Sequence, residues 1–119
     1  MKILNVVGTR PNFIKISPII EQMTQLKEFT PILLHTGQHH DNSMSRVFFD
    51  QLKIPKPDFN LDVGVGNTPE QVGEIMKKFD PVIRKVDPSA VLVVGDVSST
   101  IACALVASYN GFPVIHVEA

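Results

Sequence analysis

The sequence predicts an α/β protein built on a doubly wound, Rossmann-like parallel sheet. Short apolar runs alternate with segments whose apolar residues recur at helical spacing, and the short runs are continuous rather than alternating. A continuous apolar run is typical of a strand covered on both faces, as in parallel sheets. Strands that alternate with helices form such sheets through right-handed crossovers.

The first strand is expected over Lys2–Val7, and Gly8 ends it. A helix over Asn12–Lys27 should follow, because apolar residues recur at i, i+3, i+7 and i+10 from Phe13 onward. Pro18 falls inside this helix and removes one backbone hydrogen bond. We therefore expect a kink there, or a loosened pair of first turns.

The middle of the chain should hold two strands and two helices. Pro31–Thr36 is expected to be the second strand, and Asn42–Leu52 a second helix with its apolar residues facing inward. The proline- and glycine-rich stretch that follows contains one short candidate strand, Phe59–Leu61. Thr68–Gln71 has the pattern of an N-cap, an N1 proline and a capping-box glutamine, so a helix should begin there and end near Val86.

The last part of the chain repeats the strand–helix–strand pattern. Ala90–Val94 is expected to be a buried strand, Ser98–Asn110 a helix with Gly111 as its C-cap, and Pro113–Val117 the final strand. In such sheets, ligands bind at the carboxyl ends of the strands. The polar residues that follow the strands should therefore gather along one edge.

The turn after the first strand predicts a phosphate site. It leads into a helix start, where unpaired N–H groups and the helix dipole attract anions. Arg10 lies in the turn and Lys15 about one helical turn later, so we expect both cations to contact a phosphorylated ligand. The alternative is a solvated arginine and a lysine that lies along the surface. The turn lacks both G-x-G-x-x-G and G-x-x-x-x-G-K-[ST], which argues against a dinucleotide site and a P-loop.

Two carboxylates follow later strands. Asp96 is either the N-cap of the helix that begins at Ser98 or a catalytic group, and its residue type alone favours neither. Glu118 closes a strand that is expected to be buried, which is a poor position for stability unless the site uses it. Carboxylates that converge near two cations could perform acid–base chemistry or stabilise a developing positive charge.

The histidines and the cysteine favour structural roles. His39, His40 and Asp41 do not form a convincing metal site, because adjacent side chains point apart and no third ligand has helpful spacing. His35 and His116 are expected to be hydrogen-bonded interior histidines. The single cysteine lies in an apolar helical stretch and should be a buried structural thiol.

Composition narrows the class of protein. A length of 119 residues fits one domain with a real core, and the net charge of −1 argues against a general nucleic-acid binder. The N-terminal apolar run is shorter than the ~7 residues of a signal-peptide core. Nothing approaches the ~18 apolar residues that span a bilayer. With one cysteine, these features predict a cytoplasmic protein without nucleic-acid or membrane partners.

Four motifs, in order, resemble the bacterial non-hydrolysing UDP-N-acetylglucosamine 2-epimerases. They are GTRPNFIKISP after the first strand, HTGQHHD after the second, VVGDVSST, and the terminal HVEA. The proline of Gly-Thr-Arg-Pro is similar to the non-hydrolysing branch. Some members have glutamate and alanine where this chain has Asn12 and Phe13.

This resemblance implies a two-domain fold of the glycosyltransferase-B type, with the active site between the domains. Residues 1–119 would be the N-terminal Rossmann-like domain, and the C-terminal nucleotide-binding domain would be absent, since family members are roughly three times as long. The implied reaction interconverts UDP-N-acetylglucosamine and UDP-N-acetylmannosamine. It proceeds by elimination of UDP to 2-acetamidoglucal and re-addition, and the isolated chain is expected to be inactive.

The resemblance also assigns roles to residues. Asp96 and Glu118 match two catalytic carboxylates, and Arg10 and Lys15 would steady the pyrophosphate. Gln38 and His39 match a region near a second, regulatory nucleotide-sugar site. Neither a metal nor a nicotinamide cofactor is implied, and the family is usually homodimeric. Two alternatives are the acceptor-side domain of a glycosyltransferase and a non-catalytic module that binds nucleotide sugars.

Overall fold

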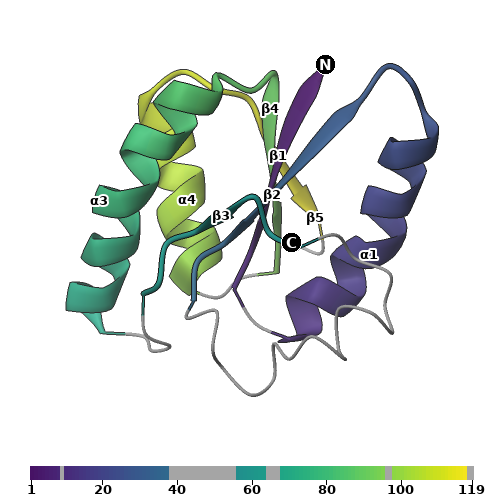
Figure 1. Cartoon of the computed structure of the whole chain (residues 1–119). Helices are drawn as coiled ribbons and strands as arrows, with labels where there is room; N and C mark the ends of the chain where they lie inside the picture. Colours follow the sequence, from purple (N-terminus) through teal and green to yellow (C-terminus); the bar gives the residue numbers. More distant parts are fainter. Residues whose placement is uncertain (9, 38–55, 64–67, 96–97, 118–119) are drawn as a thin grey trace.

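The computed structural model describes residues 1–8, 10–37, 56–63, 68–95 and 98–117 (Figure 1). Its helices and strands follow one another in the alternating order that the sequence predicts. The strands are β1 (Lys2–Val7), β2 (Thr30–His35), β3 (Phe59–Asn60), β4 (Ala90–Val94) and β5 (Val114–Val117). The helices are α1 (Arg10–Gln25), α3 (Pro69–Val86) and α4 (Ser98–Tyr109).

All five strands are parallel and form one sheet in the order β3-β2-β1-β4-β5. Helix α1 covers one face, and α3 and α4 cover the other (Figure 1). Alternate residues of β1 divide between two cores: Leu4 and Val6 pack toward α3 and α4, whereas Ile3 and Val7 pack toward α1. The predicted doubly wound sheet is confirmed.

The strand order reverses direction between β1 and β4. From β1 the chain moves to β2 on one side, and from β4 it moves to β5 on the other. Helix α1 therefore begins at the end of β1 on one face, and α4 begins beyond the end of β4 on the opposite face. The carboxyl ends of two such strands leave a crevice between the diverging helices, which is where ligands bind in open α/β sheets. We call this place the β1/β4 crevice.

The predicted helix ends are also found. The Thr68 hydroxyl accepts the Gln71 N–H at 3.3 Å, and the Gln71 side-chain oxygen accepts the Thr68 N–H at 3.5 Å, so the capping box at the start of α3 is complete. Gly111 follows α4 with a φ of 80°, the left-handed conformation expected of a C-cap.

Most predicted boundaries agree with the structure to within two residues. Helix α1 begins and ends two residues earlier than predicted and continues through Pro18. The predicted helix Asn42–Leu52 lies outside the described residues. The last strand differs in one respect that matters: it is not buried, because β5 forms the edge of the sheet and, among the described residues, has a neighbouring strand on one side only.

Candidate functional site

Asn12 links the two strand ends that border the β1/β4 crevice. Its Oδ1 accepts the N–H of Gly8, which follows β1, at 3.3 Å. Its Nδ2 lies 3.7 Å from the position that a Cβ on Gly95, which follows β4, would occupy. The side chain is buried, so this amide holds the end of β1 by a hydrogen bond and lies near the end of β4. Sequence reasoning treated Asn12 only as a variation within the family. Asn12 lies in the first helical turn after a glycine that ends a strand. This position is the sequence signal that could have predicted its hydrogen bond to Gly8.

Two hydroxyls close on Gly8 from the face covered by α4. A Cβ on Gly8 would lie 2.5 Å from Ser99 Oγ and 2.8 Å from Thr36 Oγ1, both far below contact distance. Thr36 follows β2 and is 3% exposed, and Ser99 lies in the first turn of α4 and is 8% exposed. Glycine is needed here because of this close approach. The sequence analysis assigns Thr36 to the second strand and does not predict that it meets Ser99 at Gly8.

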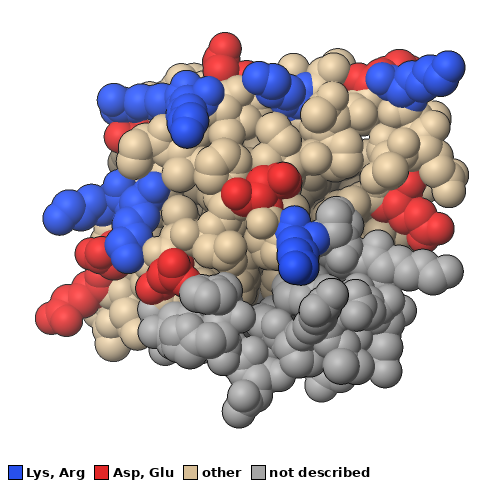
Figure 2. Space-filling view, in the orientation of Figure 1, with Lys and Arg blue, Asp and Glu red and all other residues tan. Residues whose placement is uncertain are grey.

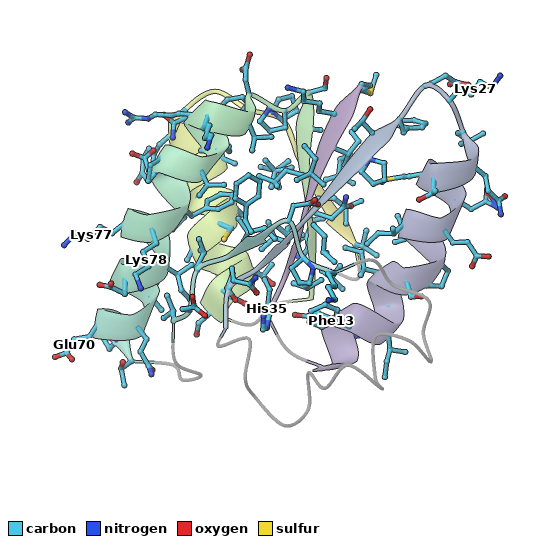
Figure 3. The ribbon with its side chains drawn as sticks, in the orientation of Figure 1. Phe13, Lys27, His35, Glu70, Lys77 and Lys78 are labelled. Carbon is cyan, nitrogen blue, oxygen red and sulfur yellow. The ribbon has the colours of Figure 1, made fainter. Side chains whose placement is uncertain are left out.

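The opposite face of the same edge is closed by an aromatic contact. The rings of Phe13 and His35 meet edge to face, with centroids 5.3 Å apart and an interplanar angle of 64° (Figure 3). His35 is buried, as predicted. A Cβ on Gly37 would lie 3.2 Å from His35 Nε2, so the histidine also supports the backbone that follows β2.

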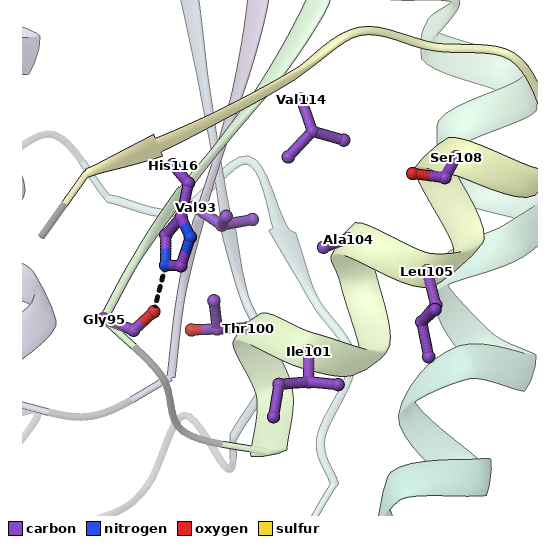
Figure 4. Close-up of a pocket in the computed structure, with 9 residues that line it drawn as sticks. All are labelled: Val93, Gly95, Thr100, Ile101, Ala104, Leu105, Ser108, Val114 and His116. Atoms are coloured by element: carbon purple, nitrogen blue, oxygen red, sulfur yellow. Dashed lines mark hydrogen bonds between the residues drawn. The ribbon is translucent and has the colours of Figure 1, made fainter. Parts of the chain in front are cut away.

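A second pair of contacts ties the ends of β4 and β5 together. Gly95 has a φ of 77°, its N–H donates to the Val117 carbonyl at 3.0 Å, and its carbonyl accepts from His116 Nε2 (Figure 4). The prediction of an interior histidine is wrong for His116, which is exposed because β5 is an edge strand. Its hydrogen bond joins the residues that directly precede Asp96 to those that precede Glu118.

An apolar groove of ≈ 260 Å³ lies beside His116, between α4 and β5 (Figure 4). Its walls are almost wholly apolar and do not suit a phosphate. The residues that form most of the lining are Val93, Ile101, Ala104, Leu105, Val114 and His116.

The structure describes only two of the six predicted site residues, Arg10 and Lys15. The sequence predicts Arg10 in the turn before the helix, whereas in the structure it is the first residue of α1, three residues after the end of β1. Its side chain lies outside what the structure describes. Lys15 is exposed, one helical turn further along α1. The other four predicted residues, Asp96, Glu118, Gln38 and His39, lie outside the described residues.

Within the described part of the chain, the remaining titratable groups form no second catalytic or metal-binding site. Burial raises the pKa of the Cys103 thiol well above its ordinary value, so the thiol is poorly suited to act as a nucleophile. In the described ranges, no three His, Cys, Asp or Glu side chains are grouped to hold a metal ion. None of the helices described is both long enough and apolar enough to cross a membrane.

The charges on the visible surface are mixed in sign. Figure 2 shows basic and acidic side chains interleaved over the described part of this face. The composition agrees, with 11 Lys and Arg against 12 Asp and Glu. The described part of this face therefore carries no continuous basic surface.

Comparisons with known proteins agree on one family. The sequence profile of the UDP-N-acetylglucosamine 2-epimerases matches residues 21–119. A UDP-N-acetylglucosamine 2-epimerase homolog of Methanococcus maripaludis is 45% identical over 119 residues, which is 100% of this chain and 33% of the relative. The UDP-2,3-diacetamido-2,3-dideoxy-D-glucuronate 2-epimerase of Pseudomonas aeruginosa is 44% identical over 100% of this chain and 34% of its own length.

A solved structure gives the same result. The Methanocaldococcus jannaschii UDP-GlcNAc 2-epimerase, crystallised with UDP-GlcNAc and UDP, superposes with a TM-score of 0.92 at 39% identity. The match covers 100% of this chain and 33% of that one. The chain thus spans about a third of the length of the curated relatives it matches.

Proposed function

Because the chain belongs to the UDP-N-acetylglucosamine 2-epimerase family, we propose that it forms the N-terminal, catalytic part of an enzyme that interconverts UDP-N-acetylglucosamine and UDP-N-acetylmannosamine. The observation that carries the proposal is the position of the Gly8–Lys15 motif. It joins β1 to α1 at the β1/β4 crevice, where a helix N-terminus favours an anion and where we propose that Arg10 and Lys15 bind a diphosphate.

The chemistry of this reaction requires both cations and carboxylates. The proton on carbon 2 of the sugar has no adjacent carbonyl to acidify it, so direct removal is very difficult. We propose that the C2–H bond and the bond from C1 to the diphosphate break in one elimination, and that UDP leaves with the electron pair. Protonation of the resulting 2-acetamidoglucal on the opposite face, followed by return of UDP, gives the other epimer.

Each predicted residue has a role in this scheme. Arg10 and Lys15 stabilise the negative charge that gathers on the departing diphosphate. Asp96 and Glu118 transfer the carbon-2 proton or stabilise the oxocarbenium-like transition state. Gln38 contributes with His39 to a separate regulatory site for a nucleotide sugar.

Several features of the whole protein belong to the same proposal. We propose that residues 1–119 are one half of a two-domain, glycosyltransferase-B type protein, because the chain covers about a third of each relative. The isolated chain is then inactive. The parent protein is proposed to be a homodimer in the cytoplasm, and a single buried cysteine suits that reducing compartment.

A second substrate is suggested by one of the relatives. The Pseudomonas aeruginosa UDP-2,3-diacetamido-2,3-dideoxy-D-glucuronate 2-epimerase is 44% identical, about as similar as the Methanococcus maripaludis UDP-N-acetylglucosamine 2-epimerase at 42%. The diacetamido sugar is therefore the second candidate, with the same inversion at carbon 2.

Incubation with each nucleotide sugar in deuterated water tests the proposal. The parent protein should form the carbon-2 epimer and introduce deuterium at carbon 2, and the preferred substrate identifies the branch. Transfer of the sugar to an acceptor without epimerisation would instead favour a glycosyltransferase. Binding without turnover would favour a non-catalytic module.

Substitution of the carboxylates tests their roles. Asp96→Asn and Glu118→Gln in the parent protein should lower kcat by about 10² or more, because each removes a group that handles a proton or a charge. The urea unfolding midpoint should stay unchanged. If Asp96→Asn mainly lowers stability and leaves kcat intact, Asp96 is a helix cap and not a catalytic group.

A further inference from the structure

We propose that the hydroxyls of Thr36 and Ser99 bind the sugar ring of the nucleotide sugar, on the α4 side of the β1/β4 crevice. The inference rests on the proposed function and adds to it the place of the sugar. No charged residue is required for this contact, which sets it apart from the diphosphate site at the start of α1.

The geometry of the two hydroxyls is unusual for side chains with a purely structural role. They come from different elements, yet both oxygens lie within 2.8 Å of the same point, the Cβ position of Gly8. Both residues are more than nine-tenths buried. No hydrogen bond among the described residues engages either hydroxyl, whereas the neighbouring Thr100 Oγ1 donates to the Val94 carbonyl at 2.7 Å. Thr100 thus shows what a structural hydroxyl in this turn looks like.

Neither oxygen is fully enclosed. In the described part of the chain, Asn5 Oδ1 is the one fully enclosed side-chain polar atom without a partner. A hydroxyl with no protein partner in a residue this buried forgoes about 1–3 kcal/mol of hydrogen bonding, which a ligand group at the crevice would restore.

The type of ligand group follows from the chemistry of a hydroxyl. It is neutral and both donates and accepts, so it matches sugar hydroxyls and the acetamido group better than a phosphate. The cations Arg10 and Lys15 belong to α1, on the other face of the sheet. Asp96, which is proposed to act on carbon 2, comes three residues before Ser99 in the chain. The sugar therefore lies toward α4 and the diphosphate toward α1.

Gly8 allows the two hydroxyls to lie this close to the end of β1. A methyl group there would lie 2.5 Å from Ser99 Oγ and 2.8 Å from Thr36 Oγ1, and it would push both side chains away. Glycine at this position therefore keeps both hydroxyls against the end of β1.

The test measures sugar and diphosphate recognition separately in the parent protein, with whichever nucleotide sugar it turns over. Thr36→Val and Ser99→Ala should each raise KM for the nucleotide sugar by about 2- to 10-fold, the value of one net hydrogen bond. The inhibition constant of UDP, which lacks the sugar, should stay within about two-fold. Thr36→Ser keeps the hydroxyl and should recover most of the loss in KM that Thr36→Val causes.

Thr100→Val is the matched control, since it removes a hydroxyl that has a partner in the protein. It should lower the unfolding midpoint without a selective effect on sugar binding. Equal loss of UDP and nucleotide-sugar affinity in Thr36→Val and Ser99→Ala, or no loss of either, overturns the inference alone. If the wild-type parent turns over neither nucleotide sugar, the proposed function fails, and this inference fails with it.

Discussion

At the scale of single residues, His116 is the side chain whose position the sequence described least well. It is exposed on the edge strand, yet its Nε2 donates to the carbonyl of Gly95. The bond joins the segments that lead to Asp96 and Glu118, so we expect His116 to position these two carboxylates if they are catalytic.

Replacement of His116 should affect turnover more than binding. His116→Phe in the parent protein should lower kcat by about tenfold or more and change KM by less than about two-fold, because small misplacements of catalytic groups are costly. His116→Gln retains an N–H donor at similar reach and should recover most of the loss. Steady-state kinetics check this. A fall in kcat that Gln does not recover would mean that the ring, and not the hydrogen bond, matters.

The candidate site was predictable from sequence only in part, for a geometric reason. The motif at Gly8 and Arg10 placed a phosphate site at the end of β1, because a strand-ending glycine and a helix start are local signals. The convergence of Thr36 and Ser99 on Gly8 depends on the register of β2 against β1 and on the angle at which α4 leaves β4. Neither the register nor the angle can be predicted from a short stretch of sequence.

At the scale of elements, prediction succeeded where burial alone decides the structure. The bounds of β1 and β4 were predicted without error, because both strands are covered on both faces and read as unbroken apolar runs. The last strand has an equally apolar sequence, and its exposure was missed. Whether this strand is exposed depends on which other elements pack against it, and the sequence of the strand alone does not show this.

The start of α3 allows a prediction about stability that does not depend on the packing of side chains. The capping box between Thr68 and Gln71 is exposed, so its energy comes from the two backbone N–H groups that it satisfies. Thr68→Ala should lower the free energy of unfolding by about 1 kcal/mol. Urea denaturation followed by circular dichroism measures it. Thr68→Ser keeps the hydroxyl and should cost much less, and equal losses in the two variants would rule out the capping explanation.

At the scale of the whole molecule, the uncovered edge of the sheet leaves apolar surface in water. Ile101 and Leu105, on α4, are 51% and 42% exposed and border the groove beside β5. Removal of apolar surface from water is favourable by roughly 25 cal/mol per Å², so this region favours association.

The 119-residue chain should therefore self-associate as its concentration rises. The double variant Ile101→Lys, Leu105→Lys should remain monomeric at concentrations where the unmodified chain does not, as sedimentation velocity would measure. Lys77→Glu, an exposed change on α3, is the matched control and should leave association unaltered. Equal association in both variants would place the contact elsewhere on the molecule.

The first of the described strands along this chain, β1, lies in the middle of the finished sheet. Ile3 pairs with Pro31 on one side and with Ala90 on the other, so the second partner leaves the ribosome about sixty residues after the first. At 5–20 residues per second this delay is roughly 3 to 12 s. During that interval β1 has one neighbour and an open, apolar edge. The β1/β4 crevice, where the proposed chemistry takes place, is thus among the last parts of this domain to form, and a nascent chain needs protection until it does.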